Sequence, residues 1–189
     1  LYDYRVVMVD DDATEKGTGE GSETQLCPLP AARRRRGLLA IRGSFQTLLS
    51  ILDFVGEGVT REELIDHLRS VLSGNRDSSL GVVINSLIGE FGVLRRDGME
   101  YRLTERGVAL LETGDGSELA DWLLTRILGV DLALVALRED GPMANSDLVA
   151  RIKEANPGWT TDYAPSAMAS WLKALGYIAS TEDGRVGLS

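Results

Sequence analysis

The chain has 189 residues, of which 43% are hydrophobic and 26% charged, and its formal net charge is -9 at pH 7. The hydrophobic content is too high for a disordered chain, and the length allows one or two compact units. The negative charge excludes a broadly basic nucleic-acid-binding surface, because Lys and Arg side chains supply most of the affinity for phosphates. Neither a signal peptide nor an apolar run of about 18 residues is visible, so we expect a cytoplasmic protein with no membrane partner.

Residues 1–42 are expected to form a separate N-terminal segment. Residues 4–9, "YRVVMV", are apolar and β-branched and predict a short strand, and the charged, Gly-rich run after them predicts a linker. Four consecutive arginines follow, from Arg33 to Arg36. A run of like charges usually lies in solvent, so these arginines either face the acidic linker or contact a phosphate backbone.

Residues 43–116 are predicted to form a first domain that begins with three helices. The first helix starts at Ser44, and Thr60 with Glu63 forms the capping box of the second. The third helix lies in "SSLGVVINSLIGEF", and the apolar side chains on one of its faces are Leu80, Ile84, Leu87, Ile88 and Phe91.

A β-hairpin is predicted after the third helix, within residues 92–104. Two β-prone runs flank Asp97 and Gly98, a pair that supplies the backbone angles of a tight turn. Thr104 then caps the helix "ERGVALLE".

The same order of elements is predicted again in residues 117–189, the second domain. "SELADWLLTRIL" reads as a connecting helix, and the almost wholly apolar "DLALVALRED" as a central core helix. Two more helices follow, the second with Pro165 near its start, and a hairpin is predicted around Asp183 and Gly184.

Three helices followed by a hairpin is the order of the winged-helix fold, and "YRLTERGVALL" resembles the wing-to-helix junction of that superfamily. The expected fold class is therefore mainly α with short β-hairpins (α+β), built as two tandem winged-helix units. "NPGWTTDYAPSAMASWLKALGYI" resembles regions of bacterial restriction and DNA-defence proteins, either McrB-like or Mrr-like. This resemblance implies the DNA-reading or assembly part of such a system, since nuclease and ATPase motifs are missing.

In DNA-binding winged helices the third helix enters the major groove and the wing contacts the backbone. The polar and basic candidates for these roles in the first unit are Arg76, Ser78, Ser79, Asn85, Ser86, Arg95, Arg96 and Arg102. We expect Asn85 to pair with adenine, and Arg95 and Arg96 to lie along phosphates. Acidic residues nearby, such as Glu90 and Glu100, interrupt this positive patch.

The second unit offers fewer basic residues. Its candidate contacts are Trp159, Thr161, Tyr163, Ser166, Ser170, Lys173 and Arg185. Trp159 and Tyr163 could stack on an exposed base. The alternative, which we favour, is that these aromatic side chains pack the turn onto the core.

Nothing in the sequence forms a catalytic constellation, so we expect no enzymatic activity from this chain alone. His67 has no nucleophile or second histidine placed beside it and is interpreted as a surface or capping residue. The acidic run at residues 10–12 lacks a second ligand cluster and Cys27 is the only cysteine, so we expect no metal and no cofactor.

Two functions remain open at this point. The first is a DNA-binding module within a restriction or defence assembly, with DNA and other protein subunits as partners. The second is an acidic scaffold for protein–protein interactions, like the winged-helix subunits of chromosome-condensing complexes; the charge total favours it. The oligomeric state stays open.

Overall fold

The computed structural model describes residues 27–41, 44–72 and 77–189. The predicted strand at residues 4–9, the acidic linker and Arg76 lie outside them. Within the described residues the fold is mainly helical with small antiparallel strand pairs, which confirms the α+β class. None of the helices found there is long and apolar enough to cross a membrane.

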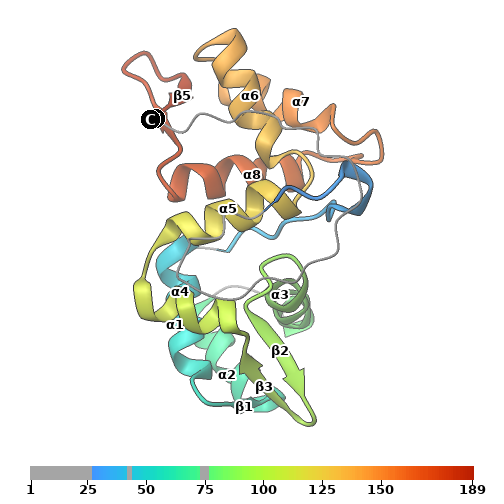
Figure 1. Cartoon of the computed structure of the whole chain (residues 1–189), viewed down its shortest axis with the longest axis vertical. Helices are drawn as coiled ribbons and strands as arrows, with labels where there is room; N and C mark the ends of the chain where they lie inside the picture. The colour runs from blue at the N-terminus through green and yellow to red at the C-terminus, as the bar shows by residue number, and fades with distance from the viewer. Residues whose placement is uncertain (1–26, 42–43, 73–76) are drawn as a thin grey trace, which may run out of the picture.

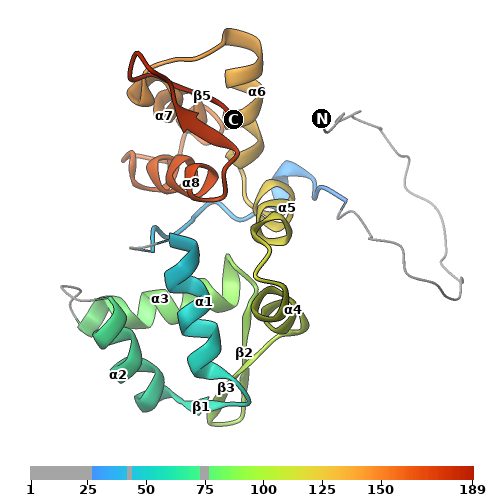
Figure 2. The ribbon, with the colours of Figure 1, turned by 90° about the vertical axis from the view of Figure 1, so that its left-hand side faces the viewer.

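The elements fall into two groups, joined by α5 (Figures 1 and 2). η1 (Ala31–Arg33) lies beside α5 (Figure 2). The N-terminal group is α1 (Ser44–Val55), β1 (Val59–Thr60), α2 (Arg61–Val71), α3 (Asp77–Gly89), β2 (Leu94–Asp97), β3 (Glu100–Leu103) and α4 (Glu105–Thr113). The C-terminal group is α5 (Gly116–Arg126), α6 (Val130–Asp140), α7 (Asn145–Lys153), α8 (Tyr163–Ala174), β4 (Ile178–Ser180) and β5 (Val186–Leu188).

The capping box predicted for the second helix is present at the start of α2. The Thr60 side chain accepts a hydrogen bond from the Glu63 backbone at 3.3 Å, and the Glu63 carboxylate accepts one from the Thr60 backbone at 2.8 Å. Each side chain satisfies a backbone N–H that the helix itself leaves without a partner. The second helix therefore begins where the sequence predicts.

The predicted hairpin at residues 92–104 is also present. β2 and β3 pair from Leu94 opposite Leu103 to Asp97 opposite Glu100, and Gly98 turns the chain with a φ of 61°. β1 adds to the other edge of β3, so the sheet has the order β1-β3-β2.

α4 packs directly on the backbone that enters β2. The Thr104 hydroxyl accepts a hydrogen bond from the Gly107 backbone at 3.1 Å and donates one to the Gly92 carbonyl at 2.8 Å. A Cβ on Gly107 would lie 2.3 Å from the Val93 carbonyl oxygen, so only glycine allows this approach. The "LTERG" pattern thus reflects a helix cap and a backbone contact.

In the C-terminal group, α6 packs against α7 and α8, and β4 pairs with β5 across a turn with Gly184 at a φ of 78°. The prediction that α6 is a central core helix holds for one of its faces, which contributes Val130, Ala133, Ala136 and Leu137 to the core. Its residues Leu132 and Val135 are 38% and 43% exposed, because α6 buries only one face. Part of an almost wholly apolar sequence run therefore lies at the surface.

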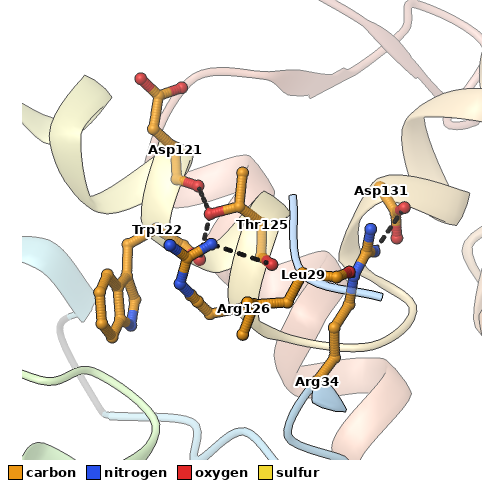
Figure 3. Close-up of polar contacts among 7 residues, drawn as sticks. All are labelled: Leu29, Arg34, Asp121, Trp122, Thr125, Arg126 and Asp131. Atoms are coloured by element: carbon orange, nitrogen blue, oxygen red, sulfur yellow. Dashed lines mark hydrogen bonds and ion pairs between the residues drawn. The ribbon is translucent and has the colours of Figure 1, made fainter. Parts of the chain in front are cut away.

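Residues 27–41 run along α5 and the start of α6 (Figure 3). The Leu29 N–H donates to the Thr125 carbonyl at 3.1 Å, and Arg35 exchanges backbone hydrogen bonds of 2.9 Å with Arg126 and Leu128. The Arg34 guanidinium pairs with Asp131 at 2.6 Å and its side chain is only 12% exposed. The arginine run is therefore not a uniformly solvated stretch.

The two groups share buried contacts. Trp171 of α8 is 1% exposed, packs its ring edge-on to Phe91 at 5.1 Å between ring centres, and donates to the Leu39 carbonyl at 2.8 Å. Trp122 of α5 donates to the Glu90 carbonyl at 2.8 Å. Buried side chains of both groups belong to one contiguous cluster, and the domain division at residues 116 and 117 stays a prediction.

Candidate nucleic-acid interface

The exposed face of α3 is short and carries little charge. Asn85 is exposed, as predicted, and Val82 beside it is 56% exposed. Ser79 is half-buried. Ser86, which we expected to point outward, is only 5% exposed, because it lies on the side of α3 that carries Val83 and Leu87. The side chain of Ser78 lies outside the described part of the chain.

Two arginines from other segments lie over the two glycines of α3. An Arg61 guanidinium nitrogen is 3.7 Å from the position that a Cβ would take on Gly81, and one of Arg35 is 3.1 Å from that position on Gly89. Both arginines are exposed, and neither has an ion-pair partner among the described residues. The glycines leave room for these side chains against the helix.

The two arginines lie at different heights along α3. Gly81 and Gly89 are eight residues apart, so about 12 Å of helix separates them. Asn85 lies midway between the two glycines. The face therefore has a basic residue near each end and an amide at its centre, and we call it the α3 face.

The wing arginines do not form a single basic strip. Arg95 lies opposite Arg102, whereas Arg96 lies opposite the buried Tyr101. Successive side chains of a strand point to opposite faces of the sheet, so Arg95 and Arg96 cannot line the same face. Arg102 pairs with Glu100 at 2.8 Å and with Asp97 at 3.4 Å. The outer face of the wing carries equal numbers of these positive and negative side chains.

The aromatic candidates of the second unit have different environments. Trp159 is half-buried against the core and donates to the Arg36 carbonyl at 2.6 Å, which agrees with the core-packing interpretation. Tyr163 is 56% exposed at the first residue of α8.

The polar candidates of the second unit offer little positive charge that is available to bind phosphate. Lys173 donates to the Ser180 hydroxyl at 2.7 Å, and Arg185 pairs with Asp183 at 2.6 Å. Thr161 and Ser170 are exposed, and Ser166 is half-buried. The second unit is therefore a poor phosphate-binding surface.

Two further arginines make contacts within the protein. Arg106 and Arg126 lie over the Trp122 ring, 4.2 Å and 5.4 Å from its centre. Burial lowers the pKa of Arg106, and its guanidinium donates to the Glu118 carbonyl at 3.0 Å. Arg126 donates to the Cys27 carbonyl at 2.8 Å. These contacts are internal, so neither arginine adds to the α3 face.

His67 of α2 is half-buried against α1. Its ring stacks on Phe54 at 3.9 Å between centres, and its Nε2 is buried with no hydrogen-bond partner. This burial lowers the pKa of His67, and a hydrogen bond to the Ser50 backbone opposes the shift in part. No group of three or more potential metal ligands occurs among the described residues.

The shifted pKa of His67 predicts a pH-dependent stability. Because the unfolded chain titrates at the ordinary value of 6.5 and the folded chain lower, the unfolded state binds more protons as pH falls. The stabilisation is complete above pH 6.5 and is lost as pH falls through 6.5 toward the folded pKa. We expect the free energy of unfolding, measured by urea titration, to fall by less than about 1.4 kcal/mol per pH unit between about pH 7 and pH 5.5. In His67→Phe this slope should be absent, and an identical slope in both proteins would contradict the assignment.

Comparison with known proteins does not identify what this chain binds. No family model matches the chain, and no curated protein matches it. A solved structure, the binding domain of the BpuJ1 endonuclease in complex with pyrene- and phenanthrene-modified DNA, is similar with 10% identity and a TM-score of 0.46. The similarity covers 85% of this chain and 83% of that one. A likeness at this level carries no inference about what this chain binds.

Proposed function

We propose that this chain is a non-catalytic DNA-binding module of a restriction or DNA-defence assembly, and that it binds duplex DNA through the α3 face. The observation that carries the proposal is the placement of Arg35 and Arg61 at the two ends of a helix face with Asn85 between them. The order α1, β1, α2, α3, β2, β3 supports it, because this is the order of a winged helix. The hairpin after α8 supports a second, degenerate unit.

Each residue of the α3 face has a distinct part in this proposal. Arg35 and Arg61 contact phosphates on either side of the major groove, and Asn85 reads a base edge, since an amide forms two hydrogen bonds with adenine. The net charge of -9 and the paired wing arginines limit the number of phosphate contacts. With two to four contacts, the logarithm of the affinity falls by roughly 2 to 4 per tenfold increase in salt.

A salt titration with charge-reversal variants tests the proposal. Arg61→Glu and Arg35→Glu are each expected to weaken binding to a short duplex by at least about tenfold, because each loses a phosphate contact and adds a repulsive charge. Each is also expected to lower the salt slope by about 0.9. Fluorescence anisotropy at several salt concentrations measures both quantities.

Arg138→Glu is the matched control, because Arg138 is exposed on α6 and makes the same change in net charge. If all three variants bind alike, the affinity reflects net charge only and the α3 face is not the contact. Arg61 is the first residue of α2, where an acidic side chain favours the helix dipole, so the fold should be retained.

The protein-scaffold alternative also has one observation in its favour. Leu132 and Val135 are exposed one turn apart on α6, in a chain with a net charge of -9. A scaffold would show no salt-dependent affinity for the duplex. Wild-type protein that fails to bind DNA at low salt would therefore favour this alternative.

A further inference from the structure

A cavity of about 240 Å³ lies between α3 and the first residues of α8. Segment 37–39 supplies part of its lining, including Leu38 and Leu39. α3 contributes Val82 and Ser86, and Tyr163 comes from α8. Because Val82 also belongs to the exposed side of α3, the cavity opens beside the α3 face.

The hydroxyl of Ser86 is the unusual feature of this cavity. Ser86 is 5% exposed, and its Oγ has no hydrogen-bond partner. A buried hydroxyl without a partner destabilises the folded state, and such groups in native proteins call for an explanation. Because this Oγ has almost no accessible surface, the Ser86 side chain must rotate toward the cavity before an atom of a ligand there can supply the missing partner.

The size and lining of the cavity restrict the ligand. The volume greatly exceeds the roughly 30 Å³ share of one water molecule and is below the roughly 300–1,000 Å³ of sites for drug-sized ligands. The lining is mostly apolar, and Tyr163, 56% exposed, offers a ring face for stacking. These features suit one flat ring system with polar atoms at its edge.

The charged and polar residues of the lining restrict the chemical class of the ligand further. Glu90 lines the cavity and would repel a phosphate or carboxylate, whereas its carboxylate can accept from an amine. Asn85, also in the lining, can both donate and accept. Adenine and cytosine carry an exocyclic amine beside a ring acceptor on the Watson–Crick edge, which unpaired bases present for recognition.

We propose that the cavity takes a single extrahelical adenine or cytosine from DNA bound on the α3 face, with its edge at Ser86 and its ring on Tyr163. The inference rests on the proposed function, because it needs DNA at this face. Turning a base out of a duplex is unfavourable because stacking and pairing are lost, and the cost is smallest where the base is already unpaired. The protein therefore prefers a duplex that contains an unpaired adenosine or cytidine.

The test compares three duplexes of one length and sequence: fully paired, with one unpaired adenosine, and with an abasic site in place of that adenosine. The abasic duplex keeps the local flexibility but lacks the base. Wild-type protein is expected to bind the adenosine duplex about tenfold more tightly than the abasic duplex, by fluorescence anisotropy. Equal affinities for these two would overturn the inference.

Two variants locate the effect in the cavity. Ser86→Ala removes the hydroxyl, and Ala164→Phe fills space at the cavity lining contributed by α8. Both are expected to keep the affinity for the fully paired duplex and to lose most of the preference for adenosine. Ser86→Ala gives the same information if Ala164→Phe does not fold. A preference that survives in a folded variant would overturn the inference.

The outcomes of these binding measurements distinguish a failure of this inference from a failure of the proposed function. Wild-type protein that binds none of the duplexes contradicts both, whereas salt-dependent binding to all three with equal affinity contradicts the cavity alone. A further measurement tests whether free adenosine binds the protein. If it binds wild-type protein and not Ser86→Ala, while the adenosine duplex shows no advantage over the abasic one, the cavity holds a free nucleoside and the extrahelical base is excluded.

Discussion

Trp171→Ala is expected to lower the free energy of unfolding by about 3–5 kcal/mol. The side chain is 1% exposed and contacts Phe91 edge-on, and its indole N–H donates to the Leu39 carbonyl. The substitution leaves a cavity and a carbonyl without its hydrogen-bond partner. The loss is large because the free energy of unfolding of a typical domain is only about 5–15 kcal/mol. Guanidinium titration followed by circular dichroism measures the change.

Trp171 also reports on whether the two groups of elements fold together. Because it joins α8 to Leu39 and Phe91, wild-type protein is expected to unfold in a single transition. Trp171→Phe is the control, since it keeps most of the ring and loses the hydrogen bond, and it should cost clearly less than Trp171→Ala. Two separate transitions in wild-type protein, or a loss below about 1 kcal/mol in Trp171→Ala, would contradict a shared core.

Gly107→Ala is expected to destabilise the protein by about 3 kcal/mol, the upper part of the range for overpacking. In an ordinary helix interior the same change is stabilising, by roughly 0.5–1 kcal/mol. Here the new methyl group would lie 2.3 Å from the Val93 carbonyl oxygen, so α4 must move away from the strand. That movement also strains the hydrogen bonds of Thr104 with Gly92 and Gly107.

Gly81→Ala is the matched control for this prediction. Gly81 also lies inside a helix, but the nearest atom to a new Cβ is the end of the Arg61 side chain at 3.7 Å, which is ordinary contact. Thermal unfolding should show Gly81→Ala at least as stable as wild type. If Gly107→Ala behaves in the same way, the close approach of α4 to the strand is not what keeps glycine at this position.

The features that sequence reasoning predicted correctly depend on neighbouring residues. The capping box of Thr60 and Glu63, the cap at Thr104 and the hairpin turn at Gly98 are all set within a few residues of chain. Helix periodicity likewise located α1, α2, α3 and α8. These signals survive folding because the same backbone groups need the same partners in any tertiary context.

The features that the sequence did not predict depend on packing between distant segments. Ser86 was placed outward because helix spacing alone does not tell which neighbour covers a polar residue. The exposed side of α6 was missed because an apolar run does not show that only one face is covered. The wing arginines were treated as a pair, although the register of β2 with β3 separates them.

The α3 face was recognised only in part. Asn85 was identified, and Arg35 was noted as a member of the arginine run, but Arg61 was not considered. The signal available in the sequence was the pair Gly81 and Gly89, eight residues apart on the third helix, where large side chains from elsewhere can lie. Nothing in the sequence showed which side chains would occupy those places.

The path of residues 27–41 has a consequence for synthesis of the protein. The Leu39 carbonyl accepts a hydrogen bond from Trp171, which lies 132 residues later in the chain. Arg34 pairs with Asp131, which lies 97 residues later. At about 5–20 residues per second, a ribosome needs roughly 7–26 seconds to translate the longer of these intervals. The segment is synthesised before both of these partners, so a nascent chain that stops before α8 should leave the Leu39 carbonyl without its Trp171 hydrogen bond.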